Sequence, residues 1–400
     1  MFDMESRHII EALRSGVPSR TVGQYFSQAR PKILGEIRDR LDKTVNTSRS
    51  GGMVISGKYG EGKTHMLSTV FNMAQEQNMV VSQISLSKET PMDKLPVFYR
   101  KLMSNTYLPN RQQPGIMQEV EKLTAGSAVG TEMILYSGKQ LETDKLYFLL
   151  RSYFATENND ERFLLQADLE GDFISNGELK KLYRRLFSET AKYNIPFSKT
   201  KHTMDYINFM SHLFKTMGYG GWVILVDETE LMGRLSKKAR LNAYRNMAEF
   251  LLPKDSLQST FTVFALSASY NEDVIEAKHE LENLGELYPD NEEPMLTVIE
   301  KLTEALQLNP LTNEEIKSVF AQIIAFHGSA YDWQPQCSVE KLMEISKSGG
   351  YLLRTKIRTA IEYMDELFQY GDGAISTITE LKTESFEENE ISLEDLDVAP

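Results

Sequence analysis

Short apolar runs alternate with segments of helical periodicity along most of this chain. Four runs are rich in β-branched and other apolar residues, and they cover residues 53–56, 80–86, 222–226 and 261–266. Runs of this length are typical of parallel strands that are buried on both faces. The pattern therefore predicts an α/β fold built on a parallel sheet.

Amphipathic helices are predicted before and between these strands. Residues 5–15 and 20–45 have helical spacing, and Gly16-Val17-Pro18 separates the two segments. Further helices are predicted over 65–75 and 238–252, each following one of the strands. This order of strands and helices is that of an α/β sheet with covering helices.

The segment 101–220 has a different character. Its apolar spacing predicts helices over 146–154, 179–193 and 204–217, and it contains no strong strand pattern. We interpret it as a helical insertion into the sheet and as the natural place for a partner-specific function. The acidic stretch 168–172 superficially suggests a calcium loop, but its ligand spacing and glycine position do not match an EF-hand.

The C-terminal part is predicted to be helical from residue 308 to about 370. Thr312 and Glu315 have the spacing of a capping box that starts a helix. A later helix opens after the pair Gly349-Gly350. Residues 384–400 are acidic and contain no lysine or arginine, so they are either a disordered, solvating tail or a short peptide that docks on a partner.

The main chemical signal is the stretch G-x-x-x-x-G-K-T, which begins at Gly57. Gly57, Gly60 and Gly62 let the backbone wrap around a polyphosphate and aim N–H groups at its oxygens. Lys63 can reach the β- and γ-phosphates, and the Thr64 hydroxyl can hold Mg²⁺. A strand before the loop and a helix after it complete the context of a P-loop, because the helix N-terminus faces the anion. The predicted nucleotide-binding residues are Gly57, Gly60, Glu61, Gly62, Lys63, Thr64 and His65.

Polar side chains at the ends of two other strands extend this site. Asp227 directly follows the run 222–226 and is expected to hold Mg²⁺ together with Thr64. The adjacent Glu228 is placed to polarise an attacking water as a general base. Ser267 follows the next strand and is a candidate contact of the γ-phosphate or its water, although an ordinary strand-ending serine fits the pattern equally well. Glu230 is a further carboxylate to which the pattern assigns no role.

Composition narrows the class of protein further. The 400 residues are 41% hydrophobic and 25% charged, as in an ordinary globular protein of two or three domains. Cys337 is the single cysteine, so an intramolecular disulfide and a Cys-based zinc site are excluded. No apolar run approaches 18 residues and the N-terminus lacks a signal-peptide pattern, so we expect a cytoplasmic protein without membrane contact.

The net charge of −13 argues against a general affinity for nucleic acid. Two basic clusters nevertheless lie at helical spacing and are either solvated helix faces or DNA contacts. They comprise Lys180, Lys181, Arg184 and Arg185, and Lys237, Lys238, Arg240 and Arg245.

The order of these features resembles that of AAA+ ATPases, particularly the branch that contains the origin-recognition ATPases. There the helical lid begins near a Pro-Leu-Thr-x-x-Glu element, here Pro310 to Glu315. The chain is also similar to a bacterial family that includes the small ATPase of BREX phage-defence loci. The residues that carry this second resemblance are 10–18, the P-loop through His65, 87–91, and the glycines before Arg354.

The resemblance runs from about residue 7 to 370 and is weaker in the insertion. It implies ATP and Mg²⁺ as cofactors, self-assembly, and partner proteins in a defence system that senses or handles double-stranded DNA. Arg354, near the start of a lid helix, is a candidate to reach over the phosphates, and a helix-face arginine in an ion pair is the alternative interpretation. The chain lacks an Asn-Lys-x-Asp element for guanine, which favours adenine.

Two functions remain open from the sequence. The first is an ATPase in which Glu228 positions water, and the second is a nucleotide-gated adaptor that hydrolyses ATP slowly. AAA+ rings usually carry an arginine finger before the lid, but no arginine lies between Arg245 and Arg354. A finger would therefore come from Arg234, Arg240 or Arg245, from the insertion, or from a partner.

These predictions combine into one domain plan. An N-terminal helical segment covers residues 1–45, and a P-loop ATPase core with the insertion covers 46–300. A helical lid at 301–380 and an acidic tail at 381–400 follow.

Overall fold

The computed structural model describes residues 3–16, 20–26, 29–287, 293–347 and 352–371. These residues pack as two compact units. One unit joins the described residues up to 16 with those from 310 onward, and the other contains those from 20 to 309. The acidic tail and the glycine pair at 349–350 lie outside the described residues.

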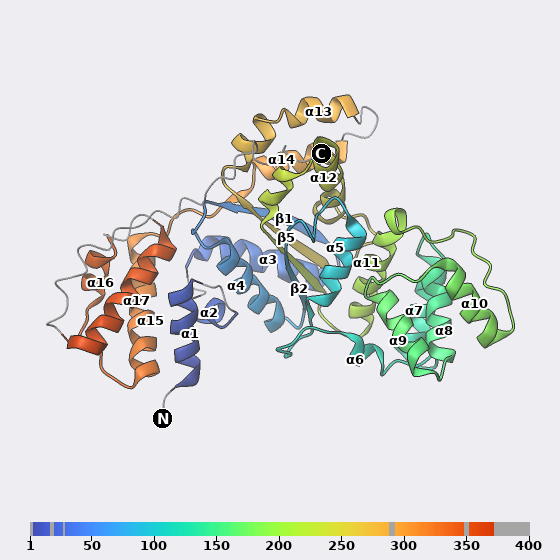
Figure 1. The fold of residues 1–400 in the computed structure, drawn as a ribbon, viewed down its shortest axis with the longest axis horizontal. Coiled ribbons are helices and arrows are strands. Elements are labelled where there is room, and N and C mark those ends of the chain that lie inside the picture. Colours follow the sequence, from blue (N-terminus) through green and yellow to red (C-terminus); the bar gives the residue numbers. More distant parts are fainter. Residues whose placement is uncertain (1–2, 17–19, 27–28, 288–292, 348–351, 372–400) are drawn as a thin grey trace, which may run out of the picture. The chain divides into compact units, whose positions relative to one another are not determined.

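A six-stranded sheet forms the centre of the larger unit, with the strand order β3-β2-β4-β5-β1-β6 (Figure 1). Every pairing is parallel except the one between β2 and the short β3. The α/β prediction, with a largely parallel sheet, is therefore confirmed. The strands are β1 Gly51–Gly57, β2 Val80–Ser85, β3 Thr106–Tyr107, β4 Trp222–Asp227, β5 Thr260–Ser267 and β6 Leu306–Gln307.

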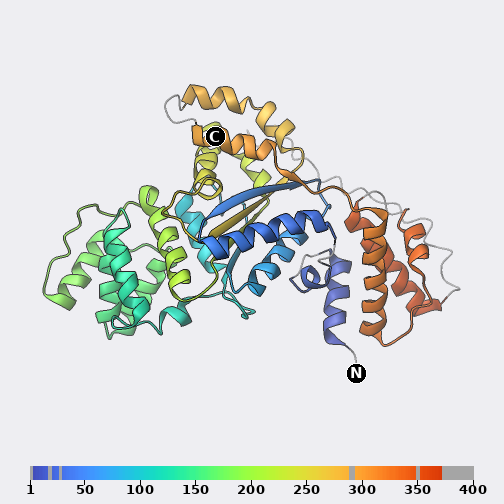
Figure 2. The same ribbon diagram turned by 180° about the vertical axis from the view of Figure 1, so that it is seen from behind.

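Both faces of the sheet are covered, which explains why its strands are continuous apolar runs. In β4, Val223 and Leu225 point into one hydrophobic core, while Ile224 and Val226 point into another. Helices α3 (Pro31–Thr47) and α4 (Lys63–Glu76) contribute to the first core; Figure 2 shows α3, in blue, crossing in front of the strands. The second core is closed by α5 (Leu95–Ser104), α11 (Lys199–Thr216), α12 (Lys237–Leu251) and α14 (Glu293–Thr303).

The register of the sheet brings the ends of four strands to one edge. Gly57 at the end of β1 is paired with Ser267 at the end of β5. Asp227 at the end of β4 is paired with Ser85 of β2, and β4 also pairs with β5. Ligands of parallel α/β sheets bind at this carboxyl edge.

The N-terminal segment 20–45 is not one helix as its spacing suggested. Helix α2 (Arg20–Tyr25) ends early, and α3 begins at Pro31. Arg30 precedes the proline and has a left-handed backbone (φ 59°), a conformation that cannot continue an α-helix.

The insertion is largely helical, as predicted, with two differences. The two-residue strand β3 pairs with β2 in a region where no strand was expected. Helix α10 ends at Phe187 rather than near Tyr193, because Ser188 takes a left-handed cap conformation (φ 56°). The insertion helices, which gather beside α11 in Figure 1, are α6 Met117–Val120, α7 Ala128–Lys139, α8 Lys145–Ala155, α9 Asn159–Leu169 and α10 Asn176–Phe187.

A fully buried ion pair holds these insertion helices together. Lys145 Nζ lies 2.6 Å from Asp168 Oδ2 and donates to the Ile174 carbonyl at 2.8 Å. Tyr206 of α11 donates to the other Asp168 oxygen at 2.6 Å. Burial lowers the pKa of Lys145 and raises the pKa of Asp168, because each charge has lost its water. Asp168 thus has a structural role, which agrees with the rejection of a calcium loop in this stretch.

Breaking this pair should destabilise the protein strongly. Lys145→Met leaves the Asp168 carboxylate buried without its counter-charge, so we expect the free energy of unfolding to fall by about 3–5 kcal/mol. Urea denaturation measures the loss. The double variant Lys145→Met with Asp168→Leu removes both charges and should cost clearly less; equal costs would contradict the argument.

The smaller unit combines the first helix with the C-terminal helices. The Arg14 guanidinium of α1 (Met4–Ser15) donates to both oxygens of Asp365 at 2.8 and 3.0 Å. His327 donates through Nε2 to Asp365 at 3.1 Å, because its Nδ1 accepts a hydrogen bond from Trp333. The first and last helices that the structure describes are therefore tied by one partly buried polar network. The partner helices are α15 Asn313–Tyr331, α16 Val339–Ile345 and α17 Leu353–Tyr370.

The predicted start of α15 is confirmed. The Thr312 hydroxyl accepts from the Glu315 amide, and the Glu315 carboxylate accepts from the Thr312 amide, which makes a complete capping box. Across the ranges that the structure describes, none of the helices combines the length and apolar character needed to cross a membrane.

Candidate functional site

The P-loop connects the end of β1 with the start of α4. Gly60 and Gly62 have positive φ angles of 76° and 91°, so glycine suits the backbone of this turn at both positions. Helix α4 starts directly afterwards, and the Met66 amide donates to the Gly62 carbonyl at 2.9 Å. The Glu61 carboxylate accepts from the Lys58 amide at 2.7 Å and thereby closes the loop on itself.

Two residues that lie between α2 and α3 support this loop and the start of α4. The Arg30 guanidinium donates to the Glu61 carbonyl at 2.8 Å and to the Asn309 carbonyl at 3.0 Å. His65 Nε2 lies 3.2 Å from the Phe26 carbonyl, and burial lowers the pKa of this histidine. Neutral His65 therefore donates to that carbonyl through Nε2. The role of Arg30 had no signal in the sequence, because its contacts depend on the turn before Pro31.

Lys63 and Thr64, the first residues of α4, reach the ends of the neighbouring strands. Lys63 Nζ donates to the Gly57 carbonyl at 3.1 Å, and the lysine is 8% exposed. The Thr64 hydroxyl donates to Asp227 Oδ2 at 2.6 Å, and Asp227 Oδ1 accepts from the Glu228 amide at 2.9 Å. The structure thus brings the P-loop lysine and threonine together with the acidic end of β4.

The oxygen atoms of Thr64 and Asp227 fit a magnesium ion. Mg²⁺ prefers hard oxygen ligands and takes one or two from protein side chains, while water and phosphate supply the rest. In the described part of the chain no group of three or more His, Cys, Asp or Glu side chains could hold a metal by itself. The hydroxyl and carboxylate pair therefore suits an ion whose coordination is completed by a nucleotide.

Glu228 and Glu230 stand in different surroundings. Glu228 is exposed and has a left-handed backbone (φ 55°) at the start of the 3-10 helix η1 (Thr229–Arg234). Glu230, within η1, points back into the site: its Oε1 lies 3.6 Å from Lys63 Nζ and its Oε2 accepts from the Ser267 amide at 3.2 Å. The sequence assigned no role to Glu230, because no spacing rule relates it to Lys63 or to β5.

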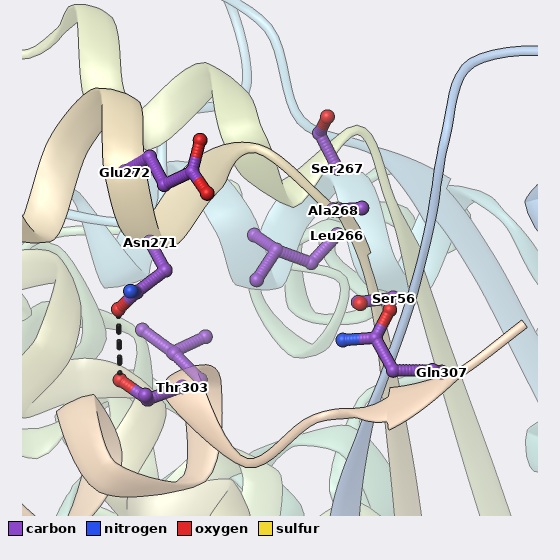
Figure 3. A pocket seen from close by; sticks show the side chains of 9 residues that line it. Ser56, Leu266, Ser267, Ala268, Asn271, Glu272, Thr303 and Gln307 are labelled. Atoms are coloured by element: carbon purple, nitrogen blue, oxygen red, sulfur yellow. Dashed lines mark hydrogen bonds between the residues drawn. The ribbon is translucent and has the colours of Figure 1, made fainter.

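Ser267 lies beside Gly57 in the sheet, and its hydroxyl is 3.2 Å from the Ser269 hydroxyl. A polar cavity of about 190 Å³ opens next to it (Figure 3). The buried Ser56 hydroxyl, just before the P-loop, contributes to its wall and has no hydrogen-bond partner among the described residues. Figure 3 also shows the Thr303 hydroxyl bonded to Asn271, at 3.2 Å. The other lining residues are Leu266, Ala268, Glu272, Leu302 and Gln307.

A protein-family comparison identifies the family to which this chain belongs. The model of the family described as BREX system ATP-binding protein BrxC/D matches residues 3–125 and 199–373, well over half of the chain. The chain belongs to this family. The match confirms the resemblance inferred from the P-loop and its neighbouring motifs. No curated protein matches the sequence significantly.

The BrxC/D match leaves out most of the insertion. Residues 126–198, which contain α7–α10 and the Lys145–Asp168 pair, fall between the two matched ranges. The P-loop, the acidic end of β4 and Ser267 all lie within them. The candidate nucleotide-site motifs therefore lie in the parts of the chain that the BrxC/D family model covers.

Arg354 does not lie in the unit that carries the P-loop. It belongs to the first turn of α17, and its guanidinium packs against Gly16 of the same unit; a Cβ atom on Gly16 would come within 2.3 Å of Arg354 Nε. The structure thus gives Arg354 a packing contact at the end of α1.

Arg240 is committed to an internal ion pair. Its guanidinium donates twice to Glu280 Oε1, at 2.6 and 3.0 Å, and once to the Leu235 carbonyl. Arg240 is 5% exposed and Glu280 is 0% exposed. Because the Arg240 guanidinium is already held in this buried ion pair, it is poorly placed to act as an arginine finger or as a DNA contact. Arg234 and Arg245 are exposed.

Proposed function

We propose that this BrxC/D family member binds and hydrolyses ATP with Mg²⁺. The observation that carries the proposal is the direct hydrogen bond between Thr64 and Asp227 beside the partly paired Lys63. It joins the two motifs that P-loop enzymes use for the metal and the phosphates, although they are far apart in the chain. The family description, an ATP-binding protein of the BREX system, supports the choice of nucleotide and a role in phage defence with partner proteins.

Each residue has a proposed role in the reaction. The amides of the loop from Gly57 to Gly62 and the Lys63 ammonium bind the phosphates. Thr64 and Asp227 hold Mg²⁺, which when bound neutralises charge on the β- and γ-phosphates. Glu228 accepts a proton from water as the water oxygen bonds to the γ-phosphorus and ADP leaves. Ser267 is the proposed contact of the γ-phosphate or of that water.

We also propose that hydrolysis depends on assembly or on a partner. An arginine supplied by a neighbouring subunit can raise the rate of phosphoryl transfer by several orders of magnitude. No arginine lies between Arg245 and Arg354, and Arg240 is held by Glu280. This observation favours a second candidate function, a nucleotide-gated adaptor that binds ATP, turns it over slowly alone and recruits a partner.

Steady-state phosphate release by the purified protein separates the two candidates. Mg²⁺-dependent turnover that is lost in excess EDTA would support the ATPase, and stimulation by double-stranded DNA would place DNA in its cycle. Tight ATP binding without turnover, with or without DNA, would support the adaptor. Absence of ATP binding would overturn both.

The basic face of α10 is the proposed DNA contact. Lys181 and Arg184 are exposed there, whereas Arg185 is paired with Glu161 and Lys180 lies 4.7 Å from the centre of the Tyr193 ring. Changing Lys181 and Arg184 to glutamate should weaken binding to duplex DNA and reduce the slope of log affinity against log salt by about 0.9 per lost phosphate contact.

The matched control for this prediction is charge reversal at Lys32 and Lys43, which are exposed on α3 and belong to neither basic cluster. Fluorescence anisotropy with a labelled duplex at low salt measures both variants. Unchanged affinity of the α10 variant would show that its charges form a solvated helix face.

A further inference from the structure

The Glu230 carboxylate joins two donors from different parts of the sheet edge. One of its oxygens lies 3.6 Å from Lys63 Nζ at the start of α4, and the other accepts from the Ser267 amide at the end of β5 at 3.2 Å. Glu230 reaches both from η1, which follows β4. One side chain therefore connects the P-loop helix with the ends of two strands.

The two donors have a physical need for an anion at this place. The Lys63 side chain is 9% exposed, and a nearly buried ammonium is costly unless a carboxylate or similar group pairs with it. The partly buried backbone N–H of Ser267 likewise needs an acceptor. Glu230 meets both needs while Lys63 also donates to the Gly57 carbonyl.

An ammonium and a backbone amide are also the groups with which proteins bind phosphate oxygens. The Glu230 carboxylate thus holds donors of the kind that the terminal phosphates of a nucleotide would use. The Glu228 carboxylate contacts neither Lys63 nor the Ser267 amide. Glu228 is exposed, and its backbone amide donates to Asp227. The two glutamates of this short acidic stretch differ in what they contact.

We propose that Glu230 is the resident counter-ion of the empty phosphate site and that a bound triphosphate replaces it on Lys63. Glu230 then competes with the nucleotide, and its negative charge sets how tightly phosphate binds. After its release from Lys63, the Glu230 carboxylate keeps its hydrogen bond with the Ser267 amide. The position of the end of β5 therefore depends on whether the phosphate site is filled. This inference rests on the proposed function, because it assumes that Lys63 binds phosphate.

The variant Glu230→Gln tests the inference with little change in shape. Glutamine keeps an oxygen that can accept from the Ser267 amide, but it removes the charge that competes with phosphate. Titration of the full chain with a fluorescent ATP analogue should give a dissociation constant about five- to tenfold lower than that of the wild type. Tripolyphosphate should show the same gain by competition, whereas adenosine should show none.

Two controls distinguish this role from general repulsion and from misfolding. Glu272→Gln removes an exposed charge from the wall of the neighbouring cavity that does not touch Lys63, so it should leave the dissociation constant within about twofold of the wild type. Glu230→Asp keeps the charge on a shorter side chain and should move the affinity back toward the wild-type value. Circular dichroism checks that each variant is folded.

The outcomes separate this inference from the proposed function. If the wild-type protein binds ATP and folded Glu230→Gln binds it equally or more weakly, the inference is overturned. The ATPase proposal then still stands. An equal gain in Glu272→Gln also overturns the inference. Wild-type protein that binds tripolyphosphate but not ATP overturns the ATPase proposal, and tripolyphosphate then decides the inference. Binding of neither ligand overturns both.

Discussion

Lys63→Ala should abolish measurable ATP binding. The ammonium is the one side-chain cation that the P-loop directs into the site, and it is nearly buried beside Gly57 and Glu230. Loss of two charge-assisted hydrogen bonds to phosphate, each worth about 1.5–3 kcal/mol, raises the dissociation constant roughly 100-fold or more. Isothermal titration calorimetry with ATP and Mg²⁺ measures the change.

Lys58→Ala is the matched control for this experiment. Lys58 lies in the same loop, but its side chain is exposed, and its backbone amide makes the hydrogen bond to the Glu61 carboxylate. The alanine variant retains that amide, so its affinity for ATP should stay close to the wild-type value. Retention of wild-type affinity by Lys63→Ala would mean that ATP binds elsewhere or not through this loop.

Glu228→Gln should separate binding from chemistry. The glutamine cannot accept the proton of the attacking water, so turnover should fall by about 10²- to 10⁴-fold, which is the range for loss of a general base. ATP binding should be retained, because the Glu228 backbone amide that donates to Asp227 is unchanged. Single-turnover phosphate release measures the loss of turnover. Equilibrium binding on the same preparation measures whether the affinity for ATP is retained.

An exposed carboxylate on the same helix as Lys63 provides the control for Glu228. Glu76→Gln changes the last residue of α4, at the end away from the P-loop, and should leave turnover unaffected. If Glu228→Gln hydrolyses ATP at the wild-type rate, the water is activated by another group. Glu230, which already lies beside Lys63 and Ser267, would then be the first residue to examine.

Much of the core fold was readable from local patterns. The runs at 222–226 and 261–266 became β4 and β5 almost residue for residue, because a strand buried on both faces must be apolar at successive positions. The P-loop motif marks the turn between β1 and α4, since its glycines permit a backbone that few other residues adopt. The capping box before α15 was equally local.

Element boundaries were less predictable where a single backbone angle decides them. Arg30 and Ser188 both take left-handed conformations that end or separate helices, and neither residue type signals this by itself. The strand β3 was missed for another reason. Two residues carry no periodicity, and Thr106–Tyr107 becomes a strand only because β2 offers it a free edge.

The sequence by itself determined the chemistry at the edge of the sheet: a P-loop, an acidic strand end and a polar strand end, each encoded within a few neighbouring residues. The tertiary structure decided which side chains meet there. Glu230 reaches Lys63 and the Ser267 amide, Arg30 braces the P-loop, and Arg14 pairs with Asp365 at the other end of the chain. These contacts join residues that are distant in the chain, and they arise from sheet register and side-chain packing, which periodicity and spacing do not encode.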